Sequence, residues 1–88
     1  MIVREYTIQS AEGLHARPAT TLLRLAKKFQ SSIQIKKQEK QIELNSLLNI
    51  LGLTLKNGDS ISLIIDGPDE NDALDAMDNF FNEQLKAL

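Results

Sequence analysis

The stretch "SISLIIDGPDENDALDAM", Ser60 to Met77, passes from a strand pattern through a turn into a helix pattern. Ile61, Leu63 and Ile65 occupy every second position, which is the period of a β-strand with one face turned inward. The preceding "KNGD", Lys56 to Asp59, is a turn signal because Asn and Gly tolerate positive φ. These residues predict a turn followed by a half-buried strand.

The segment "GPDEND", Gly67 to Asp72, ends that strand and begins the last helix. Asp69 is a candidate helix cap, and Glu70 and Asp72 place negative charge beside the positive end of the helix dipole. The following residues recur at a spacing of three to four and predict an amphipathic helix whose apolar stripe is broken only late: Ala73, Leu74, Met77, Phe80, Phe81, Gln84 and Leu85.

The amino-terminal part predicts another strand and another helix. In "IVREYTI", Ile2 to Ile8, the side chains of Tyr6 and Ile8 lie on one side of a period-two pattern. The run from Ala16 to Phe29 follows with one apolar helical face, which is formed by Ala19, Leu22, Leu23 and Ala26.

Two alternating runs, "SSIQIKK" (31–37) and "KQIEL" (40–44), predict a hairpin around Gln38. Their apolar sides carry Ile33, Ile35, Ile42 and Leu44. The apolar run from Ser46 to about Leu53 predicts a short helix. The resulting order is βαββαβα. Because the strands alternate, this order predicts an α+β fold with helices on one face of a mostly antiparallel sheet.

The 88 residues suit one domain, residues 1–88, with no separate linker. The absence of cysteine and the single histidine argue against a disulfide framework and a transition-metal site, so no metal or cofactor is expected. Arg4 and Glu5 lie where a secretory signal peptide would need an apolar run. No run of about eighteen apolar residues, the length of a transmembrane helix, occurs in the sequence. We therefore expect a cytoplasmic protein without membrane insertion.

The net charge of −2 conceals an asymmetry. Residues 1–44 carry 8 Lys/Arg against 4 Asp/Glu, hence +4, and residues 45–88 carry 2 against 8, hence −6. A nucleic-acid-binding protein is expected to have a dominant basic surface with stacking aromatic residues. The few aromatic residues here have core-like spacing, so direct nucleic-acid binding is not expected.

The only histidine lies in "EGLHARPAT", Glu12 to Thr20. Gly13 permits a tight turn and Pro18 suits a first helical turn, so His15 is expected at or beside a helix N-cap. Unpaired backbone N–H groups and the helix dipole favour anions there, and Arg17 offers donors for phosphate oxygens. A neutral imidazole at this place is a competent nucleophile toward a phosphoryl group. The alternative is an ordinary surface or capping histidine.

The motif "GLHARPAT" resembles the active-site motif of HPr, the histidine-containing phosphocarrier of the bacterial phosphoenolpyruvate-dependent sugar phosphotransferase system, in its Gram-positive-type HPr/Crh family. The resemblance extends over the whole chain. It implies an open-faced β-sandwich with a four-stranded antiparallel sheet and three helices on one face. It also implies that His15 accepts a phosphoryl group on Nδ1 from phospho-enzyme I and passes it to sugar-specific IIA proteins, with Arg17 stabilising the phosphohistidine. Such a protein is a carrier and not a turnover catalyst.

The resemblance also implies regulation at Ser46, which HPr kinase/phosphorylase phosphorylates in this family to create a corepressor for the regulator CcpA. From the residues alone, a serine before a short helix is most often only an N-cap. A Crh-like regulatory paralogue that acts mainly through phospho-Ser46 is the alternative, although Crh-type proteins lack the histidine. A small ligand-binding regulatory module, with His15 only a cap, is a third interpretation.

The excess of leucine in the short helix has two explanations. If Ile50 and Leu53 face the core, the outer side carries an apolar patch for enzyme I and IIA, formed by Leu47, Leu48 and Leu51. The alternative is that these leucines are core residues. Arg24 and Lys27 would add basic charge that steers acidic partners, or would be an ordinary solvated face. Glu12 departs from the family pattern, and a carboxylate beside the phosphoryl site would make phosphohistidine less favourable.

Overall fold

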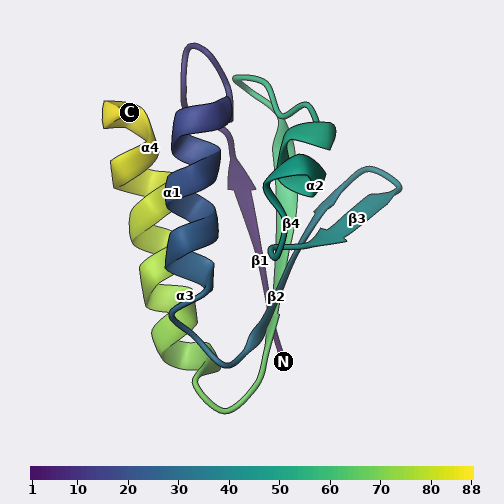
Figure 1. Ribbon diagram of the computed structural model, residues 1–88, viewed down its shortest axis with the longest axis vertical. Helices are drawn as coiled ribbons and strands as arrows, with labels where there is room; N and C mark the ends of the chain where they lie inside the picture. The colour runs from purple at the N-terminus through teal and green to yellow at the C-terminus, as the bar shows by residue number, and fades with distance from the viewer.

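The computed structural model describes all 88 residues and contains one antiparallel sheet with the strand order β1-β4-β2-β3 (Figure 1). Its strands are β1 (Ile2–Thr7), β2 (Ser32–Lys37), β3 (Lys40–Glu43) and β4 (Ser60–Asp66). Strand β4, from the stretch with period-two alternation, pairs with β1 on one side and with β2 on the other. The predicted hairpin is confirmed, and its turn places Gln38 at a φ of 55°.

Three helical segments connect and follow these strands. They are α1 (Ala16–Ala26), α2 (Leu47–Gly52) and a last helix that consists of α3 (Glu70–Asn79), the π-helical turn η1 (Phe80–Gln84) and α4 (Leu85–Ala87). The element order confirms the predicted βαββαβα. None of these helices combines the length and the apolar character that crossing a bilayer requires.

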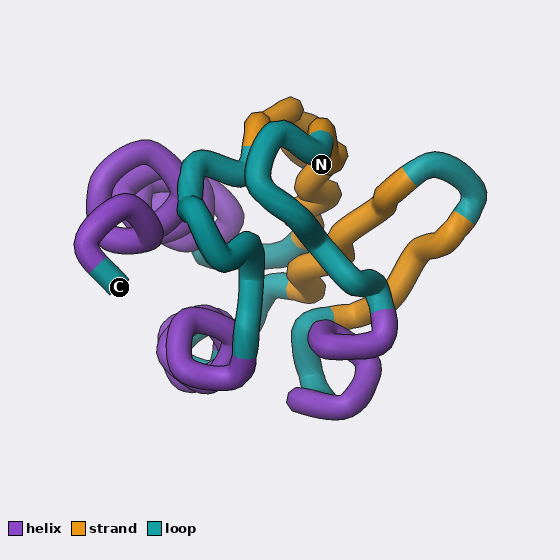
Figure 2. The backbone as a smooth tube through the Cα atoms, turned by 90° about the horizontal axis from the view of Figure 1, so that it is seen from above, coloured by secondary structure: helices purple, strands orange, loops and turns teal.

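The helices cover one face of the sheet and leave the other face open, as Figure 2 shows from above. Most of the predicted inward residues of the strands are buried under the helices, and Ile42 is half-buried. The buried ones are Tyr6, Ile8, Ile33, Ile35, Leu44, Ile61, Leu63 and Ile65. Because alternate side chains of a strand point to opposite faces, this single covered face accounts for the period-two pattern. The predicted α+β class and the open-faced sandwich are confirmed.

One helix prediction needs correction. Helix α1 ends at Ala26 instead of Phe29, because the amides of Lys28 and Phe29 bond to carbonyls three residues back and close a tighter turn. In the last helix the apolar stripe is interrupted late, as predicted, because Gln84 is exposed. The Leu85 amide donates to the Phe80 carbonyl five residues back, which brings those two side chains to the same buried side and turns Gln84 outward.

The last helix is joined to β1 by an aromatic contact and a hydrogen bond. Tyr6 stacks on Phe81 with ring centroids 5.0 Å apart, and the Tyr6 hydroxyl donates to Asp78. Burial, and secondarily this hydrogen bond, raises the pKa of Tyr6 far above its ordinary value. The phenol therefore remains a neutral donor in the core, as a buried tyrosine hydroxyl requires.

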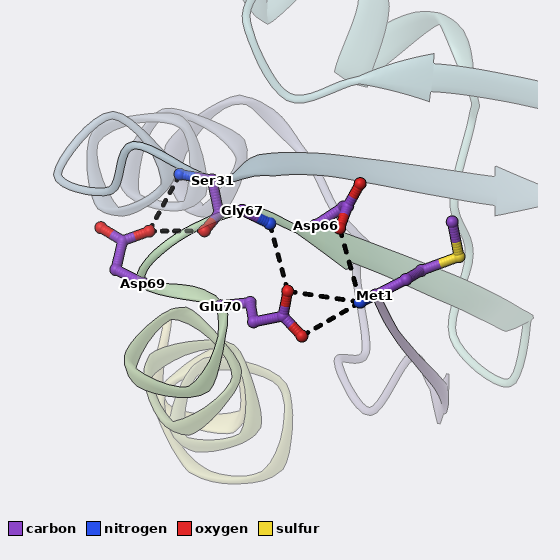
Figure 3. A network of polar contacts seen from close by, with 6 residues as sticks. All are labelled: Met1, Ser31, Asp66, Gly67, Asp69 and Glu70. Carbon is purple, nitrogen blue, oxygen red and sulfur yellow. Dashed lines mark hydrogen bonds and ion pairs between the residues drawn. The ribbon is translucent and has the colours of Figure 1, made fainter.

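Asp69 occupies the predicted N-cap position of α3, but its carboxylate does not bond to that helix. It accepts instead from the Gln30 amide at 2.9 Å. It also accepts from the Ser31 amide at 2.9 Å and from the Ser31 hydroxyl (Figure 3). Gly67 has a φ of +155°, and a Cβ there would lie 2.5 Å from the Ser31 Cα. The close approach of these two loops thus directs Asp69 across to the chain before β2 instead of along its own helix.

Glu70, the next residue, binds the backbone just after β4 and the amino group of Met1 (Figure 3). It accepts from the Gly67 amide at 3.2 Å and from the Met1 amino group at 3.1 Å, and the same amino group lies 3.4 Å from Asp66. The hydrogen bond from Ser31 is the main cause that lowers the pKa of Asp69, and the Gly67 amide is the main cause that lowers the pKa of Glu70. Both carboxylates are therefore favoured in their charged form by the fold.

We predict that acid destabilises the protein partly through Asp69. Its pKa is lower in the folded state than in the unfolded state, so its contribution is fully present above the unfolded pKa of about 4 and is lost as the pH falls through the folded pKa. Thermal unfolding of Asp69→Asn should show a lower Tm at pH 7 and a smaller fall on acidification than the parent protein. Asp75→Asn, at an exposed position without a hydrogen bond, is the control, and an equally steep acid fall for Asp69→Asn would contradict the assignment.

Candidate functional site

The loop between β1 and α1 is held by the turn that precedes β4. The Ile8 amide donates to the Asp59 carbonyl and the Gly58 amide donates to the Ile8 carbonyl, both at 2.8 Å. The Ser10 amide donates to Asn57 Oδ1 at 3.2 Å. Figure 1 shows these two loops side by side at the end of the molecule where α1 begins. The predicted turn "KNGD" therefore supports the histidine loop as well as starting a strand.

Gly13 brings the loop into direct contact with the backbone near Leu55. Its φ is +70°, and a Cβ at this position would lie 2.3 Å from the Leu55 carbonyl oxygen. The next residue, Leu14, is buried and donates its amide to the same oxygen at 3.0 Å. A side chain at residue 13 would therefore collide with the acceptor that fixes residue 14. We call the Gly13–Leu14 contact with Leu55 the loop clamp.

His15 follows the loop clamp and occupies the N-cap position of α1, as predicted. Its side chain is 34% exposed and makes no capping bond to the helix. The ring Nδ1 lies 3.2 Å from the Gly13 carbonyl oxygen, and Nε2 lies 3.3 Å from Oε2 of Glu12. The ring is thus held between two acceptors and remains accessible. Glu12 is close to the ring, as expected, but contacts Nε2 and not the predicted nucleophile Nδ1.

The start of α1 offers several features that favour an anion. The Ala16 and Arg17 amides are in the first turn, where no intrahelical carbonyl is available, and the first turn contains no acidic residue. Pro18, also in this turn, is buried and has no N–H to satisfy. The Arg17 side chain is exposed and makes no ion pair, so its guanidinium is available to an anion. This arrangement can stabilise a phosphoryl group.

The remaining basic residues of α1 extend away from His15. Arg24 is in the last turn and Lys27 is the C-cap residue, and both are exposed. At 1.5 Å per residue, Lys27 lies about 15 Å along the axis from Arg17. These side chains therefore form an extended basic stripe along α1 and not a compact cluster at the histidine.

Ser46 is the N-cap of α2, as predicted. Its hydroxyl accepts from the Asn49 amide at 3.4 Å, and the residue is half-buried. The structure confirms the local cap and leaves phosphorylation of Ser46 a prediction.

The leucines of α2 differ in exposure. Leu48 is 81% exposed, whereas Leu47 and Leu51 are half-buried and pack against the core, so the expected patch of three outward leucines is wrong for these two. Leu47, Ile50 and Leu51 are three and four residues apart, so they share the inward side of this short helix. Leu48 alone lies clearly on the opposite side.

A support behind the loop clamp was not anticipated from the sequence. Lys37 Nζ donates to the Thr54 carbonyl at 3.0 Å and pairs with Asp59 at 3.0 Å, while Thr54 has a φ of 52°. The Lys56 amide, and secondarily Lys37, lowers the pKa of the Asp59 carboxyl. The lysine thus joins both ends of the segment that contains Leu55. The alternating pattern of β2 does not indicate that its last residue, Lys37, contacts Thr54 and Asp59.

A family model described as the phosphorylation site of the HPr component of the phosphotransferase system matches residues 2–83. The chain belongs to the HPr family. The geometry of His15 therefore occurs in a phosphocarrier fold, and the histidine motif lies within the matched region.

Three relatives of the HPr family illustrate the similarity. The phosphocarrier protein HPr of Lysinibacillus sphaericus is 36% identical over 83 residues, which cover 94% of each chain. The structure of the histidine-containing phosphocarrier protein of Mycoplasma has a TM-score of 0.89 at 34% identity and covers 96% of both chains. Crh of Bacillus subtilis, a protein of catabolite repression, has a TM-score of 0.75 at 27% identity, covering 96% of this chain and 97% of that one.

We predict that Gly13→Ala disturbs the loop clamp. The added Cβ would lie 2.3 Å from the Leu55 oxygen at a φ that disfavours alanine, so the variant should lose about 1–3 kcal/mol of unfolding free energy. Denaturant unfolding measures this loss, and amide exchange should accelerate at Leu14. Gly52→Ala is a matched control, because an added Cβ at this position would meet no atom of another segment within 4 Å. Alanine also favours a helix over glycine by about 1 kcal/mol. Equal stability of the two variants would contradict the clamp.

Proposed function

We propose that the protein is a phosphocarrier of the sugar phosphotransferase system. His15 Nδ1 accepts a phosphoryl group from phospho-enzyme I and passes it to sugar-specific IIA proteins. The observation that carries the proposal is the accessible His15 imidazole at the N-cap of α1, in a chain of the HPr family. The family resemblance favours a cytoplasmic carrier formed by the one domain of residues 1–88.

The geometry supports acceptance and release of the group without a pocket of the carrier's own. A half-exposed imidazole can enter the active site of each partner, and the partner supplies the remaining catalytic groups. The first-turn amides of α1 and the Arg17 guanidinium stabilise the added negative charge during the interval between partners. The histidine receives the phosphoryl group from one partner and delivers it to another, so the protein acts as a carrier and not as a turnover enzyme.

The surface around His15 fits partners with acidic and apolar surfaces. Arg17, Arg24 and Lys27 would accelerate association with acidic surfaces, because complementary charge acts mainly on the rate of encounter. Leu48 offers an exposed apolar side chain on the neighbouring α2. Leu47 and Leu51 pack against the core and would contribute only their exposed edges to a contact with a partner.

Incubation with enzyme I and phosphoenolpyruvate is expected to add one acid-labile phosphoryl group. His15→Ala should accept none. Arg17→Ala should lower the rate or the stability of the phosphorylated form about ten- to hundredfold, which corresponds to a charged hydrogen bond of about 1.5–3 kcal/mol. Arg4→Ala, an arginine of β1, is the control. Phosphorylation that persists in His15→Ala would contradict the carrier function.

Ser46 supports a second, regulatory role in the same protein. We propose that HPr kinase/phosphorylase phosphorylates its hydroxyl and that this form binds CcpA. A phosphate at the N-cap of α2 would lie at the positive end of the helix dipole, so its effect would be a local change of charge and not unfolding. The similarity to Crh favours this role, whereas the presence of His15 favours the carrier as the main function.

ATP and the kinase are expected to phosphorylate the parent protein once and to leave Ser46→Ala unmodified. Circular dichroism of the modified protein should be unchanged, because the cap position tolerates negative charge. Ser60→Ala, at an exposed serine of β4, is the control. Loss of helix signal on phosphorylation would contradict a purely local effect.

A further inference from the structure

Glu12 and the Gly13 carbonyl compete for the histidine ring from its two sides. The carboxylate oxygen lies 3.3 Å from Nε2, and the carbonyl oxygen lies 3.2 Å from Nδ1. Both groups can only accept hydrogen bonds from the ring. A neutral imidazole carries one N–H, so it can satisfy one of these acceptors at a time.

The Gly13 carbonyl alone would favour the tautomer that is unsuitable for phosphoryl transfer. The loop clamp fixes this carbonyl beside Nδ1, and a proton on Nδ1 would occupy the electron pair that must attack phosphorus. The Glu12 carboxylate lies at ion-pair distance from Nε2, without the alignment of a hydrogen bond, and its negative charge attracts a proton on that nitrogen. The proton of the neutral ring is therefore drawn to Nε2, on the side of Glu12.

We propose that Glu12 is a positioning residue that selects the Nε2–H tautomer and leaves Nδ1 free as the nucleophile. This role deepens the proposed phosphocarrier function and rests on it. The carboxylate acts through the ring and does not contact the phosphoryl group, since it lies on the Nε2 side. Its own side chain is 76% exposed, so water weakens the interaction and the expected effect is modest.

The transfer step balances with this arrangement. The Nδ1 electron pair forms the new N–P bond, while the bond between phosphorus and the donor atom of phospho-enzyme I breaks and its electron pair stays with the donor. The proton on Nε2 stays in place, so the phosphorylated ring is an imidazolium whose positive charge faces Glu12. The carboxylate thus stabilises the ring in the product as well as selecting its tautomer in the reactant. This outcome reverses the expectation that Glu12 opposes phosphohistidine.

The tautomer is measured directly on unphosphorylated protein with ¹⁵N-labelled histidine. Two-bond ¹H–¹⁵N spectra at about pH 9, where a free imidazole is neutral, distinguish Nε2–H from Nδ1–H. The parent protein should be almost entirely Nε2–H, and Glu12→Gln and Glu12→Ser should raise the Nδ1–H fraction at least about threefold. Glu39→Gln, which removes a carboxylate from the β2–β3 turn, should match the parent. Identical tautomer ratios in all four proteins would overturn the proposal.

Phosphoryl acceptance from enzyme I and phosphoenolpyruvate supplies the second readout. Glu12→Gln should be slower about two- to fivefold, the range of an exposed charged pair. Faster acceptance would show that repulsion of the incoming phosphoryl group dominates, and it would overturn the proposal. If even the parent protein accepted no phosphoryl group, the carrier function would fail. The tautomer spectra, which need no donor, would still decide whether Glu12 positions the ring.

Discussion

The hydrogen bond from the Leu14 amide to the Leu55 carbonyl is the constraint on which the site depends. It joins the loop after β1 to the segment before β4, two parts of the chain that are distant in sequence. Gly13 allows it because a Cβ at that position would collide with the same carbonyl oxygen. The bond ends one residue before His15, so it determines where α1 begins and which groups face the ring. The helix start, the exposed imidazole and the two competing acceptors all follow from it.

The opposite end of the molecule carries the main polar contacts that hold the helix layer to the sheet. There Asp69 binds the chain before β2, and Glu70 binds the end of β4 and the amino group of Met1 (Figure 3). At the site end, Lys37 and Asp59 pair behind the loop clamp, while Arg17 makes no ion pair. The charges that stabilise the two ends therefore leave the Arg17 guanidinium unpaired at the start of α1.

Local sequence patterns predicted most of the fold. Period-two alternation located the strands, and the spacing of three to four located the helices, because each element buries one face under a single helix layer. The errors arose from interactions that such patterns do not contain. Helix α1 ends at Ala26 and not at Phe29, because the amides of Lys28 and Phe29 bond to carbonyls three residues back. Asp69 accepts a hydrogen bond from Ser31, 38 residues away in sequence, although the neighbouring residues predicted that it caps the last helix.

The candidate site divides in the same way. His15 and Ser46 lie at helix starts, which adjacent residues predict, and both N-cap positions are confirmed. The contact of Glu12 with Nε2 could not be predicted, since it depends on a ring orientation imposed by the loop clamp.

The most direct test of the account is to locate the phosphoryl group on the ring after transfer from enzyme I. Two-bond ¹H–¹⁵N spectra of the phosphorylated, ¹⁵N-histidine-labelled protein distinguish the two ring nitrogens. We expect a phosphoryl group on His15 Nδ1, with the proton retained on the Nε2 that faces Glu12. A phosphoryl group on Nε2 would contradict the proposed role of Glu12, because the carboxylate lies beside that nitrogen.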